Sequence, residues 1–308
     1  MHMIRLALTV LVLWLSLGAA GASPVAAQSD RLLIAVSTPL LADIVRNVAG
    51  DVVDVYSVMP ENADPHTWEA TPEDFVKISE SDSFISIGAH LEPFVESGGW
   101  RRAVLDAGIP QLVLAEHVEL IEVDLVIDHG DHVHDLRAGD PHIWLDPNKV
   151  IEALPAIAAH LSEIDAVHAD AYQANAGTFI TTLQELDAEL VASFQSIPEE
   201  RRTLVVFHDA YTYFAAHYGF EVIGVVLKNP ESEVSAKELA ELQTIIEDND
   251  VLVIFAEPQF STEVLDVLVS ETGIDVGELL TDAFAGRVAS YVDLMRFNRD
   301  SLVSHLGA

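Results

Sequence analysis

The sequence predicts an α/β protein of two lobes, each with a mostly parallel sheet flanked by helices, joined by one long rigid α-helix. Short apolar runs alternate with longer amphipathic segments early in the chain and again after residue 200, which is typical of parallel βα units. Between the two sets lies an unbroken helical pattern of roughly 26 residues, or about 39 Å of helix. That length is too great for a crossover within one compact sheet, so we expect this helix to tie two lobes together.

The first set of elements covers residues 32–114. Thr71 followed by Pro72 is typical of a helix start, because threonine caps the free backbone N–H groups and proline fits the first helical position. The predicted strands are 32–37, 52–58, 83–87 and 111–114, and the predicted helices are 39–49, 72–79 and 93–107.

The second set begins after residue 200. Ser235 and Glu238 form a capping-box pattern, and Gly219 and Gly273 follow apolar periodic segments, where glycine commonly ends a helix. The predicted strands are 203–207, 220–226, 252–256 and 275–280, and the predicted helices are 210–218, 235–248, 261–272 and 291–306.

The N-terminus resembles an export signal. Arg5 precedes an apolar run over residues 6–17, and small residues lead to a cleavage site near Ala27. The run is shorter than the roughly 20 residues of a membrane span, so we expect cleavage, with a retained signal anchor as the alternative. The predicted division is a signal peptide over 1–27, an N-terminal α/β lobe over 28–167, a linking helix over 168–195 and a C-terminal α/β lobe over 196–308.

The net charge, the apolar content and the absence of cysteine limit the classes of function and location that we expect. The net charge of −35 repels nucleic acid and anionic lipid and attracts cations, or else serves solubility in a salty or acidic habitat. Half of the residues are apolar, which excludes global disorder. The chain has no cysteine, so we expect neither disulfides nor a lipid-anchor cysteine, and a soluble periplasmic protein.

Four residues form a candidate metal site: His66, His142, His208 and Asp282. Each lies where an apolar run gives way to polar residues, and three imidazoles with one carboxylate suit a zinc-like divalent ion. Two of them belong to each lobe. Because ligands bind beyond the carboxyl ends of parallel strands, the four converge if the lobes face each other. Taken singly, each histidine is more typical of a surface or cap residue near a turn, and Asp282 alone could be a loop acid or a helix cap.

The segments around these residues resemble the solute-binding proteins of zinc and manganese ABC transporters, the ZnuA/TroA-like group. The matching segments, in the family's order, are 62–72 (NADPHTWEATP), 140–147 (DPHIWLDP), 207–211 (FHDAY), 255–261 (FAEPQFS) and 281–283 (TDA) followed by 291–295 (YVDLM) and Asn298. The resemblance covers essentially the whole mature chain. It implies two lobes on a rigid helix, a metal buried between them, delivery to the membrane permease of an ABC importer, and a monomer that is not an enzyme.

The same resemblance bears on the metal. Histidine at the position of His208 resembles zinc-type members, and glutamate there resembles many manganese-type members. We therefore expect Zn²⁺, with Mn²⁺ or mixed binding as the alternative. A secreted zinc hydrolase is a further alternative, but the chain has no His-Glu-x-x-His segment and no evident general base.

Further residues have possible supporting roles. Zinc-specific members often carry a long histidine-rich loop, whereas here only His129, His132 and His134 interleave with aspartates. They either capture zinc weakly and pass it inward or belong to a solvated loop. Asp209 and Glu257 could orient ligating histidines, and Asp209 is equally placed to serve as an acid at a helix start.

Overall fold

A computed structural model describes residues 31–96, 100–122, 126–128, 133–135, 139–228 and 234–307. Residues from Arg31 onward form one compact unit, and the predicted signal peptide lies outside the described residues. Within these ranges no helix is both long enough and apolar enough to cross a membrane.

The first sheet is parallel and four-stranded, as predicted, with the order β2-β1-β3-β4. Its strands are β1 (Leu33–Val36), β2 (Asp54–Ser57), β3 (Ser83–Ser86) and β4 (Gln111–Val113). The helices that alternate with them are α1 (Pro39–Ala49), α2 (Pro72–Ser79), α3 (Pro93–Glu96) and α4 (Trp100–Ala107). Of the helix predicted over 93–107, the structure describes α3 and α4, and residues 97–99 lie outside the described ranges.

The second sheet is also parallel and four-stranded, in the order β10-β9-β7-β8. Its strands are β7 (Thr203–His208), β8 (Glu221–Leu227), β9 (Val253–Ala256) and β10 (Asp275–Glu278). Its helices are α7 (Thr212–Tyr218), α8 (Ala236–Asp248), α9 (Glu263–Thr272) and α10 (Tyr291–Leu306). The predicted capping box at Ser235 forms, and the predicted cap Thr71 also forms a capping box with Asp74. Gly219 and Gly273 end their helices in the left-handed conformation.

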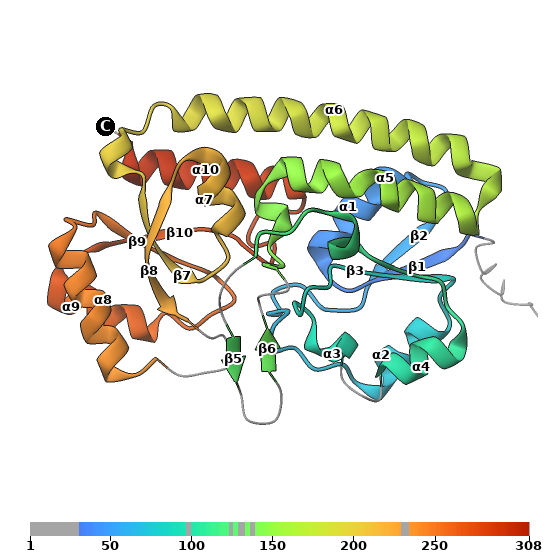
Figure 1. Cartoon of the computed structure of the whole chain (residues 1–308), viewed down its shortest axis with the longest axis horizontal. Helices are drawn as coiled ribbons and strands as arrows, with labels where there is room; N and C mark the ends of the chain where they lie inside the picture. Colours follow the sequence, from blue (N-terminus) through green and yellow to red (C-terminus); the bar gives the residue numbers. More distant parts are fainter. Residues whose placement is uncertain are drawn as a thin grey trace, which may run out of the picture. The chain divides into compact units, whose positions relative to one another are not determined.

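The long helix α6 (Ala169–Phe194) joins the two sheet units, which confirms the prediction. Its buried residues recur at helical spacing and contact α1, α5 (Pro147–Ile164) and α10. Figure 1 shows α6 running alongside α5 and α10, which lie between it and the sheets. Helix α5 was not predicted from the sequence. Its interior contains Pro155, and proline usually interrupts a helix.

Short elements complete the described chain. They are the antiparallel pair β5 (Val126–Asp128) and β6 (Val133–Asp135), and the 3₁₀ turns η1 (Leu114–His117), η3 (Ile143–Leu145), η4 (Ala166–His168) and η5 (Glu199–Arg201). A large hydrophobic core contains residues of both sheets and of α1, α5, α6 and α10. Because this core is continuous across α6, the polar loops at the carboxyl ends of the two sheets face each other on a rigid support.

Candidate metal centre

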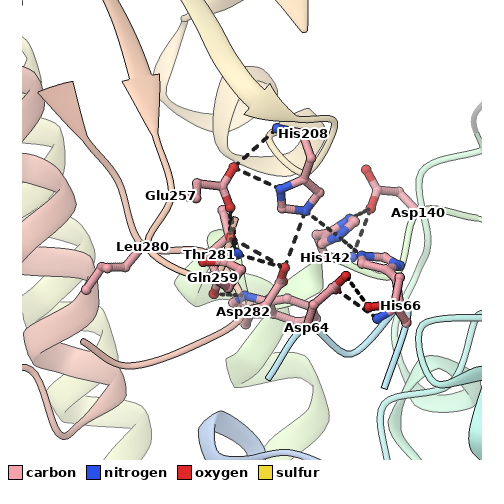
Figure 2. A network of polar contacts seen from close by, with 12 residues as sticks. Asp64, His66, Asp140, His142, His208, Glu257, Gln259, Leu280, Thr281 and Asp282 are labelled. Carbon is pink, nitrogen blue, oxygen red and sulfur yellow. Dashed lines mark hydrogen bonds and ion pairs between the residues drawn. The ribbon is translucent and has the colours of Figure 1, made fainter. Parts of the chain in front are cut away.

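The structure brings the four candidate ligands together. Ligand atoms of His66, His142, His208 and Asp282 all lie within 4.8 Å of one another. His142 Nε2 is 3.2 Å from His66 Nε2 and 3.4 Å from His208 Nε2. His208 Nε2 is in turn 3.4 Å from Asp282 Oδ2. Figure 2 shows these four side chains pointing toward a common centre.

Each candidate ligand comes from the carboxyl edge of a sheet or from a turn beside it. His208 is the last residue of β7, and Asp282 lies in the loop between β10 and α10. His66 lies in the loop between β2 and α2, and His142 comes directly before η3. Three of the four are buried and His66 is half-buried.

The two Asp-Pro-His segments fold in the same way. Asp64 Oδ1 accepts a hydrogen bond from the backbone N–H of His66 at 3.0 Å, and Asp140 Oδ1 accepts one from His142 at 2.9 Å. This local aspartate turn fixes the backbone of the following histidine. Burial raises the pKa of Asp64, although its hydrogen bonds to His66 and Thr67 oppose the rise.

Buried carboxylates orient two of the imidazoles. Asp140 Oδ1 is 2.7 Å from His142 Nδ1, and Glu257 Oε1 is 2.8 Å from His208 Nδ1. A proton on Nδ1 shared with each carboxylate leaves Nε2 as the nitrogen that faces the centre. Nε2 can then bind a metal once it carries no proton, and the carboxylate holds the ring in the ligating orientation.

The charges of the site are strongly coupled. Burial by itself would lower the pKa of His208, but the negative charges of Glu257 and Asp282 outweigh it and raise the pKa to about 10. Burial raises the pKa of Asp282 to about 6, against the opposing charges of His208 and His142. Burial would also raise the pKa of Asp140, but the charge and hydrogen bonds of His142 outweigh it and the pKa is lowered. In the absence of metal, the His208 ring is therefore positively charged at neutral pH, with a proton on both nitrogens.

Asp282 has an oxygen that suits a cation. Its Oδ1 is buried and has no hydrogen-bond partner among the described residues. Its Oδ2 lies 3.4 Å from Gln259 Nε2, and Gln259 also donates to Glu257 Oε2 at 2.8 Å. The Thr281 hydroxyl donates to the same Glu257 oxygen (Figure 2). A buried acceptor without a partner is costly, and a bound divalent ion would satisfy it.

Aromatic rings enclose the centre. Trp144 lies 5.3 Å from the His142 ring, and Phe260 lies 5.5 Å from the His208 ring. Trp144 Nε1 donates to the backbone oxygen of Thr281 at 2.9 Å, which connects the His142 segment to the loop that carries Asp282. This apolar wall lowers the local dielectric and strengthens the attraction of the site for a cation.

The supporting residues named from the sequence have different positions. Glu257 is 1% exposed, and its Oε1 lies 2.8 Å from His208 Nδ1. Asp209 is exposed. Among the described residues, the carboxylate that faces His208 Nδ1 is that of Glu257 and not that of Asp209. His129 and His132 lie outside the described residues, and His134 belongs to β6.

Sequence reasoning missed Asp64, Asp140, Gln259 and Thr281. A signal for the first two was present, because each aspartate stands two residues before a candidate ligand in a repeated Asp-Pro-His segment. Gln259 and Thr281 stand in the family-like segments 255–261 and 281–283, but only the fold shows that both contact Glu257.

Comparison with known proteins agrees with this geometry. Residues 34–305 match the family model described as zinc-uptake complex component A, periplasmic. The chain belongs to this family. The chain is accordingly a substrate-binding protein of a metal ABC transporter.

Relatives in this family are named for different metals. The manganese-binding lipoprotein MntA of Halalkalibacterium halodurans is 30% identical over 283 residues, covering 91% of this chain and 90% of that protein. The iron-binding protein YfeA of Yersinia pestis is 28% identical over 283 residues, covering 91% and 88%. The solved structure of the zinc-binding protein TroA from Treponema pallidum has a TM-score of 0.77 at 27% identity, covering 90% of this chain and all of that one. Family membership therefore establishes a divalent-metal carrier and leaves the ion open.

Proposed function

We propose that this protein binds Zn²⁺ in the periplasm through His66, His142, His208 and Asp282 and delivers it to the permease of an ABC importer. The supporting observation is the spacing of the donor atoms. Zinc–nitrogen bonds of about 2.0–2.1 Å at tetrahedral angles separate neighbouring donors by about 3.3–3.4 Å. The closest donor pairs here lie 3.2, 3.4 and 3.4 Å apart.

The donor chemistry supports zinc over manganese. Three imidazole nitrogens suit zinc, whereas manganese prefers oxygen ligands. The second candidate is Mn²⁺, favoured by the manganese-binding relatives and by the free Oδ1 of Asp282, which would add a fifth donor if the carboxylate bound through both oxygens.

We further propose that metal holds the lobes over residues 28–167 and 196–308 together as a monomeric carrier. Each lobe would contribute two ligands, so the ion would favour the closed form by its higher affinity for that form. The rigid α6 would limit opening to ligand loops and small lobe movements, and the permease would separate the ligands to release the ion.

Calorimetric titration of the chelator-stripped protein tests this proposal. We expect one site that binds Zn²⁺ more tightly than Mn²⁺, and strong loss of affinity in the His142→Ala, His208→Ala and Asp282→Ala variants. His168→Ala is the matched control, because His168 also has a carboxylate on Nδ1, at 2.6 Å from Asp165, but does not belong to this site. Tighter binding of Mn²⁺ would overturn the choice of zinc. Full affinity in the site variants would overturn the ligand set.

A further inference from the structure

A buried carboxylate outside the metal centre forms hydrogen bonds with two strand ends of the first sheet. Glu92 is 1% exposed and lies directly before α3. Its Oε1 accepts hydrogen bonds from Ser37 Oγ at 2.5 Å and from the Ile87 backbone N–H at 2.9 Å. Its Oε2 accepts one from the Gly88 N–H at 2.9 Å. Because Ser37 follows β1 and Ile87 follows β3, one side chain holds together the carboxyl ends of neighbouring strands.

The backbone beside Glu92 is strained. Gly88, Ala89 and His90 have φ angles of 84°, 50° and 63°, so three successive residues adopt the left-handed region. A Cβ atom on Gly88 would lie 2.3 Å from Val113 Cγ1, so only glycine fits there. Residues with side chains adopt this backbone at a cost, and it persists only where surrounding contacts enforce it. The hydrogen bonds of Glu92 to Ile87 and Gly88 supply such contacts.

The segment held by Glu92 supports the loop of His66. Phe94, in α3, packs edge-to-face on Trp68 with ring centroids 4.9 Å apart and planes at 89°. Trp68 follows His66 by two positions. The backbone N–H of Trp68 donates to the backbone oxygen of Asp64 at 3.0 Å. Asp64 is the residue whose carboxylate fixes the backbone of His66. A continuous path of contacts therefore runs from Glu92 through α3 to His66.

His66 differs from the other two histidines in how it is placed. His142 and His208 are buried, and each is held by a buried carboxylate on Nδ1. His66 is half-buried, and its backbone N–H donates to the carboxylate of Asp64. Its loop packs on a separate small core on one side of the first sheet, which includes Phe94 and Trp68. Its position thus depends on that core and on α3.

We propose that Glu92 is a positioning residue for His66, and that its hydrogen bonds to Ser37, Ile87 and Gly88 set how long a bound metal ion is retained. The inference rests on the proposed role of His66 as a ligand. Loss of these hydrogen bonds would let α3 and the turn of Trp68 shift. His66 would then leave the ion more often, while His142 and His208 keep their arrangement.

Metal release measured by rapid mixing with excess chelator tests this inference. In Ser37→Ala and Glu92→Gln proteins loaded with Zn²⁺, we expect release on the order of tenfold faster, the lower end of what orienting residues usually contribute to affinity. Ser83→Ala is the matched control. Ser83 is also a buried serine of the first lobe, bonded to His160 at 2.6 Å, but it begins β3 at the opposite edge of the sheet. Release at the wild-type rate from both test variants, or equal acceleration by Ser83→Ala, would overturn the inference.

A double-mutant cycle with His66→Ala separates positioning from general loosening. If Glu92 acts through His66, Ser37→Ala and Glu92→Gln have no further effect on affinity or release in the His66→Ala background. Acceleration that persists undiminished there would overturn the inference. Unchanged zinc affinity in His66→Ala alone would instead refute the proposed ligand set. Ser37→Ala removes one of the hydrogen bonds to Glu92, so the same cycle is available if Glu92→Gln does not fold.

Discussion

Metal binding at this site should release protons in a pH-dependent way. The pKa of His208 in the metal-free protein is about 10 and that of Asp282 is about 6, so His208 is protonated and Asp282 mostly ionised at pH 8. A ligating imidazole must give up the proton on its metal-facing nitrogen. Binding at pH 8 should therefore release about one proton, which comes from His208.

The sign and size of the pH effect follow. As pH rises from about 6 toward about 10, fewer protons have to leave, so affinity should rise about tenfold per pH unit. Below about pH 6 Asp282 is protonated as well, so more protons have to leave and the slope should become steeper. Above about pH 10 the proton on His208 is already lost, so its contribution to the slope should disappear.

Calorimetry of Zn²⁺ binding in buffers of different ionisation enthalpy measures the number of protons released. Glu257→Gln provides a sharper comparison, because Glu257 is the leading source of the raised His208 pKa. The variant should release fewer protons at pH 8 while binding zinc more weakly. Release of no proton by the wild-type protein at pH 8, with affinity flat between pH 6 and 9, would refute this account of the site.

Three further predictions concern support and stability. Asp140→Asn should weaken zinc binding by about 10–100-fold, because it weakens the acceptor on His142 Nδ1; a change below twofold in a titration would contradict the role assigned to Asp140. Chelation should lower the calorimetric melting temperature, since zinc at 100 times its Kd adds about 2.7 kcal/mol to the free energy of unfolding; equal melting with and without zinc would contradict selective binding to the folded state. Added NaCl should raise the free energy of unfolding of the metal-free protein, because salt screens the repulsion within a chain of net charge −35; denaturant titrations that show a fall would exclude that effect.

The periodic signals that predicted the fold were local. The alternation of strands and helices, the cap at Thr71, the capping box at Ser235 and the glycines that end α7 and α9 each depend on a few neighbouring residues, and the structure confirms them. The helix α5 was missed because tertiary packing tolerates Pro155 inside a long buried helix.

For the candidate site, the sequence by itself determined the donor types, their order and their association with turns. Asp-Pro-His is a local turn whose aspartate fixes the backbone of its histidine, so that much was encoded within three residues. Only the tertiary structure decided which atoms meet. Glu257 reaches His208 across neighbouring strands, Trp144 joins the His142 segment to the Asp282 loop, and Glu92 binds Ser37 at the end of a neighbouring strand. These contacts join residues far apart in the chain, and their energies depend on burial and on charges that only the assembled lobes bring close together.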